Sequence, residues 1–371
     1  MRLLVTALAA TARPTGLGVY AAMVGARIAR LDGRAVVAAW SPSPLDSVSA
    51  VRAGSPPRTG GVGAPIQRLS WLARRLDREA ERCGATAVLH LLPEIGRTTR
   101  PQVIVAHDLA PLVVPTSLLQ RAYFETVVRY STHMAVGVIA VSKRVGGDLT
   151  RLLGVPPERI AVVPEGVDLD AFHPSRRVEP ARPYLIAVGI HAHNKRLDLL
   201  IGAFAASRLA ATHELHLVGP FDRRYTPGLR ALAQASGAAA AISFREYASW
   251  PELAILYASA DAYVCASRYE GFCLPGLEAL ACGTPVVATD VGSLREYGGD
   301  AATIVPRDAE VDELANAMER VVRAVNDTPT LRAVARGRAE LYPWDSTAAA
   351  LVRAADELSA SSIAGATTHP S

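Results

Sequence analysis

The sequence contains almost no lysine, because only Lys143 and Lys195 contribute to its 39 basic residues. Nearly all basic residues are arginines. A lysine in such a chain therefore indicates a position that needs a compact point charge instead of a planar guanidinium. Long hydrophobic runs are also absent, and no stretch approaches the roughly 20 apolar residues that a membrane-spanning helix requires. Residues 1–12 imitate a short signal peptide, but we interpret them as a first β-strand followed by a glycine turn.

Cysteines are few and scattered, which excludes a dense disulfide scaffold. Their spacing also matches no metal-ligand pattern; they are Cys83, Cys265, Cys273 and Cys282. We therefore expect a protein of a reducing compartment, the cytoplasm. The 371 residues are too many for one ordinary core and predict two domains. A composition of 50% hydrophobic and 20% charged residues is typical of a globular protein.

Charge is unevenly distributed along the chain. Residues 1–173 carry a net charge of +7 and residues 174–371 a net charge of −3. The basic half is compatible with an anionic partner, such as a lipid phosphate, an acidic glycan or the inner face of a membrane. It is equally compatible with a solvated arginine-rich surface. Residues 67–83 illustrate both alternatives, because an apolar stripe of Trp71, Leu72 and Leu76 lies among arginines.

Apolar strands alternate with amphipathic helices along the chain, a pattern that predicts an α/β fold with parallel sheets covered on both faces. In the first domain we expect strands at residues 2–9, 35–40, 87–92, 102–106, 137–141 and 159–163. In the second we expect them at 184–189, 214–219, 242–244, 262–266, 285–288 and 302–304. Two doubly wound domains would bind a ligand at the carboxyl ends of their strands.

Composition also predicts the domain boundaries. The polar, proline-punctuated stretch 172–183 separates a domain of residues 1–174 from a second domain of residues 175–345. A helix at 346–359 follows, and we expect residues 360–371 to be disordered. The loop at 41–63 is rich in Ser, Pro and Gly, and we expect it to be mobile and able to close over a bound molecule.

The segment from Arg268 to Thr289 carries the strongest functional signal. Glu270 falls where an apolar strand gives way to a loop, and Glu278 lies one turn inside a helix that Pro275 is suited to start. The unpaired amides of that helix N-terminus predict a phosphate near Cys273 and Leu274. Carboxylates only accept hydrogen bonds, so Glu278 suits a ribose diol in the same cavity and Glu270 the hydroxyls of a sugar ring.

This segment resembles the E-x7-E motif of retaining GT-B glycosyltransferases, called glycosyltransferase family 4, and includes the Gly-Phe at Phe272 and the closing Ala-Cys-Gly-Thr-Pro-Val. The resemblance implies two Rossmann-like doubly wound domains facing a central cleft, with the helix at 346–359 crossing back to the first domain. It implies an enzyme that transfers a hexose, mannose or glucose, from a GDP- or UDP-type sugar with retention at the anomeric carbon. The acceptor would be a hydroxyl of a glycan, a lipid-linked molecule or a small molecule. The resemblance implies no cofactor and no metal.

Two glycine-containing loops extend the resemblance. The loop Gly189–Arg196 follows a strand and precedes a helix, and its Lys195 matches the family lysine that holds the donor diphosphate. Ile190, His191 and Asn194 occupy the places where an arginine usually precedes that lysine, so the second cation is Arg196, a histidine or a residue elsewhere. Between the first strand and helix, residues 15–20 resemble the family's glycine loop and place Gly16 and Gly18 near the diphosphate.

A His-Asp pair at a strand end resembles the motif on the family's acceptor side. His107 would contact the sugar or the incoming hydroxyl, and Asp108 would orient its ring or bind the acceptor. Tyr247 follows a strand at the family's nucleobase position. The predicted catalytic residues are therefore Glu270, His107, Lys195 and Asp108. The predicted donor-binding residues are Gly16, Gly18, Gly189, Lys195, Arg196, Tyr247, Glu270, Phe272, Cys273, Leu274 and Glu278.

Two other classes of function stay open on the sequence. One is a different enzyme on the same fold, such as a phosphorylase or an epimerase. The other is a non-catalytic protein that binds a sugar nucleotide or a glycan. The presence of Glu270, Glu278 and Lys195 argues against loss of activity, whereas the missing arginine before Lys195 argues weakly for it.

Overall fold

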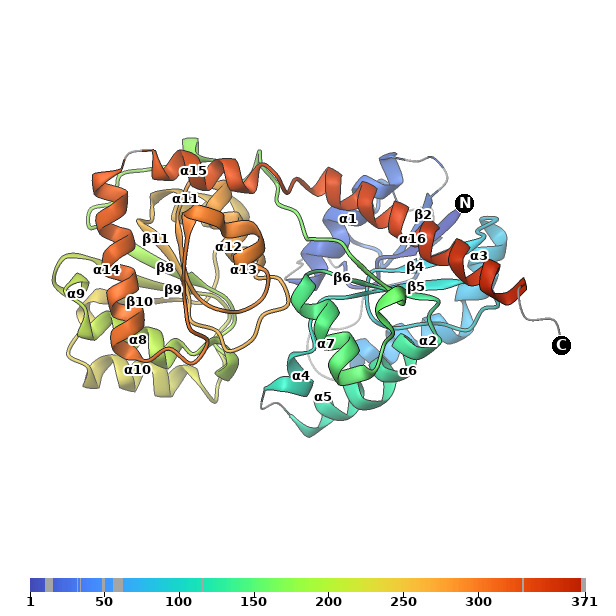
Figure 1. The fold of residues 1–371 in the computed structure, drawn as a ribbon, viewed down its shortest axis with the longest axis horizontal. Coiled ribbons are helices and arrows are strands. Elements are labelled where there is room, and N and C mark those ends of the chain that lie inside the picture. The colour runs from blue at the N-terminus through green and yellow to red at the C-terminus, as the bar shows by residue number, and fades with distance from the viewer. Residues whose placement is uncertain are drawn as a thin grey trace. The chain divides into compact units, whose positions relative to one another are not determined.

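The chain forms two compact units (Figure 1). The computed structural model describes residues 1–10, 16–31, 33, 35–48, 51–55, 63–114, 117–328 and 330–367. The first unit comprises Met1–Leu112, Thr116–Glu165 and Trp344–Ser371, and the second comprises Val113–Pro115 and Gly166–Pro343.

The boundary between the units lies earlier than the predicted residue 175. Val167 forms a β-bridge with Pro343, and the ring of Phe172 packs 5.9 Å from Trp250, so these residues belong to the second unit. At the return, Trp344 packs its indole 5.7 Å from the ring of Tyr20, which places it in the first unit. The polar composition of residues 172–183 therefore marked a surface segment of the second unit instead of the boundary itself.

The first unit is built on a seven-stranded parallel sheet in the order β3-β2-β1-β4-β5-β6-β7. Its strands are β1 (Leu3–Thr6), β2 (Ala35–Ala39), β3 (Val51–Arg52), β4 (Ala87–His90), β5 (Gln102–Ala106), β6 (Gly137–Ala140) and β7 (Ile160–Val162). Six of these strands are the predicted ones. The seventh, β3, lies in the loop that we expected to be mobile and pairs with the edge of β2, while residues 49–50 and 56–62 of that loop lie outside the described residues.

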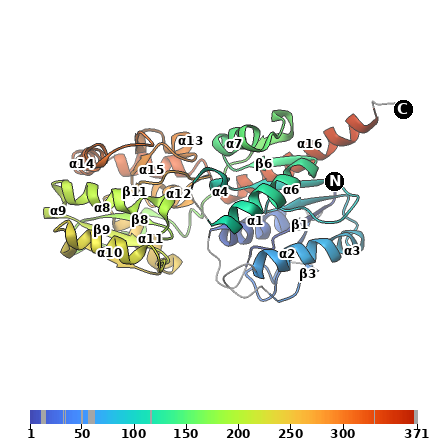
Figure 2. The same ribbon diagram turned by 90° about the horizontal axis from the view of Figure 1, so that it is seen from below.

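Helices cover both faces of this sheet (Figure 2). They are α1 (Leu17–Leu31), α2 (Gly63–Arg74), α3 (Leu76–Arg82), α4 (Ala110–Val113), α5 (Leu118–Tyr123), the π-helical turn η1 (Phe124–Val128), α6 (Arg129–Met134), α7 (Lys143–Leu153), the 3₁₀ turn η2 (Pro157–Arg159) and α16 (Trp344–Thr367). The apolar stripe predicted at residues 67–83 is buried: Trp71, Leu72 and Leu76 pack in one core cluster with Leu4 and Val88 of the sheet. That stripe is therefore part of the core and not a surface for a membrane.

The last helix, α16, packs against α1 and against strands β5 and β6 of the first unit. Gly137 on β6 accommodates it closely, because a Cβ atom there would lie 2.6 Å from Cδ1 of Leu358. The helix extends to Thr367, so the prediction of a disordered tail is wrong for residues 360–367, and residues 368–371 lie outside the described residues. Nothing in the sequence stops the helix at Leu358, since no proline follows within it and alanine favours helix.

The second unit is built on a six-stranded parallel sheet in the order β10-β9-β8-β11-β12-β13. Its strands are β8 (Tyr184–Val188), β9 (Glu214–Val218), β10 (Ile242–Arg245), β11 (Ala262–Cys265), β12 (Val286–Thr289) and β13 (Ala302–Val305). All six were predicted within two residues at each end. Strand order reverses between β8 and β11, so the loops after these two strands diverge at the carboxyl edge and leave room for a site.

Helices again cover both faces of the second sheet (Figure 1). They are α8 (Leu197–Ala206), α9 (Leu209–Thr212), α10 (Thr226–Ala235), α11 (Trp250–Ser259), α12 (Leu274–Ala281), α13 (Leu294–Gly298), α14 (Val311–Asp327) and α15 (Leu331–Ala339), with 3₁₀ turns η3 (Pro174–Arg176), η4 (His193–Lys195), η5 (Ala239–Ala241) and η6 (Gly299–Ala301). One buried core joins α8 and α14 to the inner faces of β8, β9 and β11.

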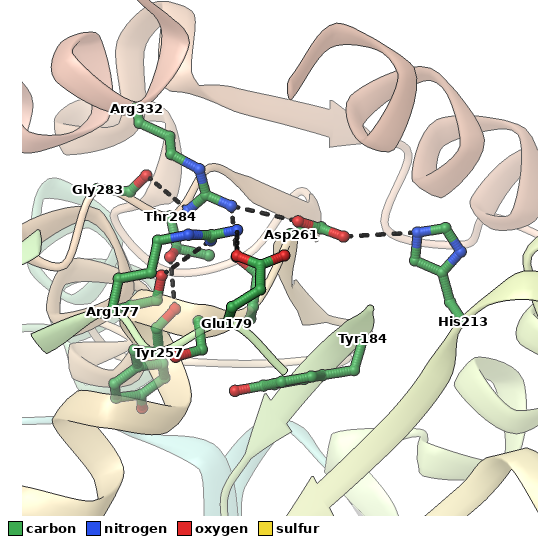
Figure 3. Close-up of polar contacts among 12 residues, drawn as sticks. Arg177, Glu179, Tyr184, His213, Tyr257, Asp261, Gly283, Thr284 and Arg332 are labelled. Atoms are coloured by element: carbon green, nitrogen blue, oxygen red, sulfur yellow. Dashed lines mark hydrogen bonds and ion pairs between the residues drawn. The ribbon is translucent and has the colours of Figure 1, made fainter. Parts of the chain in front are cut away.

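A cluster of polar contacts lies at the amino edge of the second sheet (Figure 3). Arg332 of α15 donates to the carbonyl of Ala260 at 2.9 Å and to the Asp261 carboxylate at 3.2 Å. His213 lies on the other side of that carboxylate, 3.5 Å away. Because the strands are all parallel, this cluster lies at the opposite edge from their carboxyl ends, and it anchors α15 to the sheet.

Candidate functional site

Three of the predicted donor residues of the second unit, Gly189, Lys195 and Glu270, lie where β8 and β11 end. Gly189 follows β8 directly, and the 3₁₀ turn η4 then carries Lys195 back over the sheet edge. The loop after β11 approaches it, since the amide of Arg268 donates to the carbonyl of Asn194 at 2.7 Å. Two segments about 75 residues apart in the sequence are thereby joined by the backbone.

At the centre of this edge, Lys195 and Glu270 form an ion pair. Nζ of Lys195 lies 2.6 Å from Oε1 of Glu270, and the two side chains are 23% and 13% exposed. The hydroxyl of Ser267 donates to the same oxygen at 2.6 Å. Burial opposes the charge on the lysine, but the facing carboxylate outweighs it and raises the pKa of Lys195. The site thus holds a fixed positive charge at neutral pH.

A pocket opens beside this ion pair. Its enclosed part has a volume of about 20 Å³, room for roughly one water-sized occupant. It is lined by Ala187, Val188, Gly189, Ile190, His191, Lys195, Leu197, Leu217, Val218, Tyr263, Val264, Cys265, Ala266, Ser267 and Glu270. The lining therefore comes mainly from the carboxyl ends of β8, β9 and β11 and from the loops that follow β8 and β11.

Two cysteines lie under the ion pair. The thiol of Cys273 donates to Sγ of Cys265 across 3.8 Å, and both side chains are buried. The hydrogen bond from Cys273 lowers the pKa of Cys265, with further help from the charge on Lys195. The same hydrogen bond, together with burial, raises the pKa of Cys273 well above its ordinary value.

Helix α12 begins where the sequence predicted. Cys273 precedes it with φ of 76°, a left-handed conformation that glycine adopts more readily, and Pro275 stands in its first turn. Leu274 is half-buried as its first residue. Phe272 is core, with its ring 5.2 Å from Tyr297. Phe272 was predicted to bind the donor; in this structure its ring is buried and packs in the core of the second unit.

Glu278 does not share the pocket of Glu270 among the described residues. It is 8% exposed on the second turn of α12, and it accepts a hydrogen bond of 3.2 Å from the hydroxyl of Tyr257 on α11. The prediction that both glutamates face one cavity stays a prediction: in this structure the second carboxylate accepts from the phenol of Tyr257 and is not among the residues that line the pocket beside Glu270.

Arg196, a predicted candidate for the second cation, is not among the residues that line the pocket beside Lys195. Its guanidinium donates to the backbone carbonyls of Arg307 and Ala309, so it braces the loop before α14 and does not reach the pocket. His191 does line the pocket and is fully buried. Its Nδ1 lies 3.0 Å from the hydroxyl of Thr226, while its Nε2 has no hydrogen-bond partner among the described residues.

Glycine is required where the loops after β8 and β9 cross. Gly219 has φ of 146°, and a Cβ atom on it would lie 2.1 Å from the carbonyl oxygen of Gly189. A Cβ atom on Gly189 would lie 3.5 Å from Cε of Lys195. Tyr247, on the loop after β10, is 71% exposed and its carbonyl accepts from Arg245. The exposed ring is available to a ligand but is not held by the fold.

In the first unit, His107 is held by groups other than the predicted Asp108. Its Nδ1 lies 3.1 Å from a carboxylate oxygen of Glu165, and its Nε2 donates to the carbonyl of Leu91 at 3.0 Å. The ring of Tyr20 packs edge-on against it at 4.4 Å. Asp108 accepts from the amide of Ala110, two residues further along, at 2.9 Å. The imidazole is therefore fixed on both sides.

The glycine loop of the first unit is described only in part. Gly16 has φ of 48°, and a Cβ atom there would meet nothing within 4 Å, so its backbone borders open space. Gly18 lies in the first turn of α1 and is buried. Residues 11–15 lie outside the described residues.

Two important partners escaped the sequence analysis. Ser267 and Glu165 each complete a candidate site by a hydrogen bond to a predicted residue, Glu270 and His107 respectively. A positional signal existed for both, because each follows a strand closely at the carboxyl edge of its sheet.

A search of the described residues for membrane-spanning helices found none with the necessary length and apolar character.

Comparison with known proteins follows the same division into two halves. Residues 14–171 match the family model "Glycosyltransferase Family 4", and residues 170–334 match the model "Glycosyl transferases group 1". Together the two matches span most of the chain.

Among curated relatives, the MMP alpha-(1->4)-mannosyltransferase of Mycolicibacterium hassiacum is 34% identical over 220 residues, which cover 58% of this chain and 52% of the relative. The O-antigen chain mannosyltransferase RfbU of Salmonella typhimurium is 28% identical over 242 residues, 65% of each chain. The D-inositol 3-phosphate glycosyltransferase of Actinosynnema mirum is 34% identical over 226 residues, 56% of this chain and 54% of the relative. The alignments thus span about half to two thirds of the relatives' length.

Solved structures match over nearly the whole chain. The sucrose-phosphate synthase of Thermosynechococcus elongatus superposes with a TM-score of 0.79 at 20% identity, covering 97% of this chain and 99% of the other. Anabaena HepE in complex with UDP-glucose superposes with a TM-score of 0.69 at 16% identity, covering 96% and 99%. At such identities the likeness shows a shared fold.

Proposed function

This chain belongs to glycosyltransferase family 4 and has the GT-B type of fold, and on that premise we propose that it is a retaining hexosyltransferase. Its donor is a nucleoside diphosphate sugar of the GDP or UDP type, and the transferred hexose is mannose or glucose. The acceptor is a hydroxyl group of a glycan, a lipid-linked molecule or a small molecule.

The ion pair between Lys195 and Glu270 is the observation that carries this proposal. An ammonium fixed at the carboxyl edge of a doubly wound sheet is suited to a diphosphate, and a carboxylate beside it is suited to sugar hydroxyls. The amino end of α12 adds the positive end of a helix dipole in the same loop region. A diphosphate would take over the pairing of Lys195 and release Glu270 for the sugar.

The relatives support the choice of donor and sugar. Two of those described above are named as mannosyltransferases, and the fold is shared with a protein solved in complex with UDP-glucose. A third relative is named for a phosphorylated acceptor, D-inositol 3-phosphate, which agrees with the basic first half of this chain. These alignments span only part of each relative, so the choice of acceptor rests on experiment.

We propose the following division of roles in catalysis. Charge develops on the departing diphosphate, and Lys195 neutralises it together with backbone amides at α12. The proton of the acceptor hydroxyl passes to the departing phosphate, as the family resemblance implies, and no protein base is then needed. Glu270 holds the donor sugar, Glu278 the nucleotide ribose after release from Tyr257, and His107 the sugar or acceptor from the first unit.

The experiment that tests the function is a donor-consumption assay with candidate acceptors present and absent. Purified chain is incubated with GDP-mannose or UDP-glucose, and release of the nucleoside diphosphate is followed. Release that depends on an acceptor, with the anomeric configuration retained in the product, is the expected result. Acceptor-independent conversion of the sugar nucleotide would favour an epimerase, phosphate-dependent release a phosphorylase, and nucleotide binding without turnover a non-catalytic protein.

Two variants separate the roles of the glutamates. Glu270→Ala should lower kcat about 100-fold or more while the nucleotide still binds, because it removes a contact to the reacting sugar. Glu278→Ala should mainly weaken nucleotide binding, by about tenfold, because it removes a carboxylate acceptor for a diol. Normal transfer by both variants would contradict the assignment of the motif.

A further inference from the structure

The buried pair Cys265 and Cys273 is not used by the proposed reaction. We propose that these two thiols and the Glu270 carboxylate form a binding site for a thiophilic divalent cation, Zn²⁺ in the first place. The site lies in the second unit alone, at the floor of the pocket beside Lys195. It does not depend on which sugar the protein handles.

The distances fit a tetrahedral zinc ion. Two thiolates at about 2.3 Å from a tetrahedral Zn²⁺ lie roughly 3.8 Å from each other. The two sulfurs of Cys265 and Cys273 are 3.8 Å apart, so neither side chain needs to separate from the other to admit the ion. One ligand atom of each of the three residues lies within 4.8 Å of the others. A small turn of the Glu270 side chain therefore completes a set of two sulfurs and one oxygen.

The surroundings supply what such a site needs beyond its ligands. The hydroxyl of Ser267 donates to Glu270, and the hydroxyl of Tyr263 lies 3.7 Å from Sγ of Cys273, so both kinds of ligand are oriented by neighbours. Cys265 and Glu270 border the pocket, which provides an entry path. Its enclosed volume of about 20 Å³ leaves room for a water at the fourth position of the ion.

Charge also favours a divalent ion. On binding, the thiols of Cys265 and Cys273 pass their protons to solvent, and each sulfur forms a bond to the metal without any change of oxidation state. The two thiolates and the Glu270 carboxylate then carry three negative charges, which the ion and the ammonium of Lys195 balance. A buried cluster without net charge avoids the cost of an unpaired charge.

A consequence follows for the proposed donor site. The metal draws the Glu270 carboxylate toward the sulfurs and away from Lys195, so the two occupants, metal and sugar nucleotide, compete for one side chain. This consequence rests on the proposed function, whereas metal binding itself does not.

The test is a titration of the reduced, chelator-treated full chain with Zn²⁺ alone and, separately, with Co²⁺ as a spectroscopic substitute. The expected result is one equivalent of metal bound, with thiolate-to-cobalt charge-transfer absorption in the near ultraviolet. Cys265→Ser and Cys273→Gly should each weaken binding by about 100-fold and diminish that absorption. We expect Cys273→Gly to fold, because glycine adopts the left-handed backbone conformation at this position without strain.

Cys282→Ser is the matched control. Cys282 is also a buried free cysteine next to α12, but its thiol donates to the carbonyl of Ala254 and it lies outside the cluster. The Cys282→Ser variant should bind metal like the wild type. Failure of the folded wild type to bind Zn²⁺ or Co²⁺, equal weakening by Cys282→Ser, or unchanged binding by the Cys265 and Cys273 variants would each overturn the site.

Discussion

At the scale of the residue, Lys195 is one of only two lysines among 39 basic residues. Its ammonium forms an ion pair with Glu270. The other lysine, Lys143, is exposed at the start of α7 in the first unit. This pair offers a test in which the same chemical change is made at both positions.

Lys195→Met should weaken the binding of the donor nucleoside diphosphate by about 10- to 100-fold, because a charge-assisted contact to phosphate contributes roughly 1.5–3 kcal/mol. Lys143→Met should leave binding unchanged. Isothermal titration calorimetry with the preferred nucleotide measures both. Equal affinities in all three proteins would exclude Lys195 from the phosphate site.

His90 gives a second prediction at the residue scale, and it concerns stability. Its Nδ1 accepts from the hydroxyl of Thr6 at 2.9 Å, and its Nε2 donates to the side-chain oxygen of Gln102 at 3.0 Å, which fixes the neutral ring. Burial lowers the pKa of His90 from 6.5 to about 4. As the pH falls below 6.5, the unfolded chain takes up a proton that the folded chain refuses until about pH 4. Stability is therefore lost between these two values.

The expected loss attributable to His90 is about 3 kcal/mol across that window. Chemical denaturation at pH 7 and pH 4.5 measures it, and His90→Gln should show a smaller loss than the wild type. The exposed His133 of α6 serves as the control, because His133→Gln should keep the wild-type dependence. An identical pH dependence in the wild type and His90→Gln would contradict the account.

At the scale of the element, the docking of α16 depends on a glycine in β6. Gly137→Ala should destabilise the protein by about 1–3 kcal/mol, because its Cβ would lie 2.7 Å from Cβ of Leu358 and the helix would have to move. Adding Leu358→Ala removes the close contacts with Cγ and Cδ1 of Leu358 but keeps the one with Cβ, so the two effects should be partly less than additive in thermal unfolding. Gly147→Ala in α7, where a Cβ meets nothing within 4 Å, should be neutral or slightly stabilising. Strict additivity of Gly137→Ala and Leu358→Ala would argue against the contact.

Strands were the elements best predicted from the sequence. Buried parallel strands are continuous apolar runs, so residues 137–140 and 184–188 could be located from composition alone. The two-residue strand β3 could not, since a pairing that short has no pattern of its own. The end of α16 was misjudged because the serines that follow Leu358 have a weaker helix propensity than alanine.

Contacts between side chains that are far apart in the sequence could not be predicted from it. Lys195 and Glu270 were both predicted, but their direct contact depends on how two loops meet. The turn of Glu278 toward Tyr257 and the approach of Cys265 to Cys273 depend on the rotation of α12 about its axis. A motif of two glutamates fixes their spacing along the chain and not the direction in which each side chain faces.

At the scale of the whole molecule, two doubly wound units divide the candidate residues between them. The second unit holds Lys195, Glu270 and Glu278, and the first holds His107 with Glu165. Lys195 and Glu270 lie on loops that follow strands of the second sheet, and His107 and Glu165 follow strands of the first. This arrangement agrees with the family models, which divide the chain into nearly the same halves.

The central claim is that the second unit binds a nucleoside diphosphate through Lys195. The most direct measurement is a thermal-shift screen of the full chain against GDP, UDP, ADP and TDP, with Lys195→Met measured alongside. At least one nucleotide should raise the Tm of the wild type, since a ligand at 100 times its Kd stabilises by about 2.7 kcal/mol, and the variant should respond far less. A chain whose Tm is unchanged by all four nucleotides, or a variant that responds like the wild type, would contradict the account.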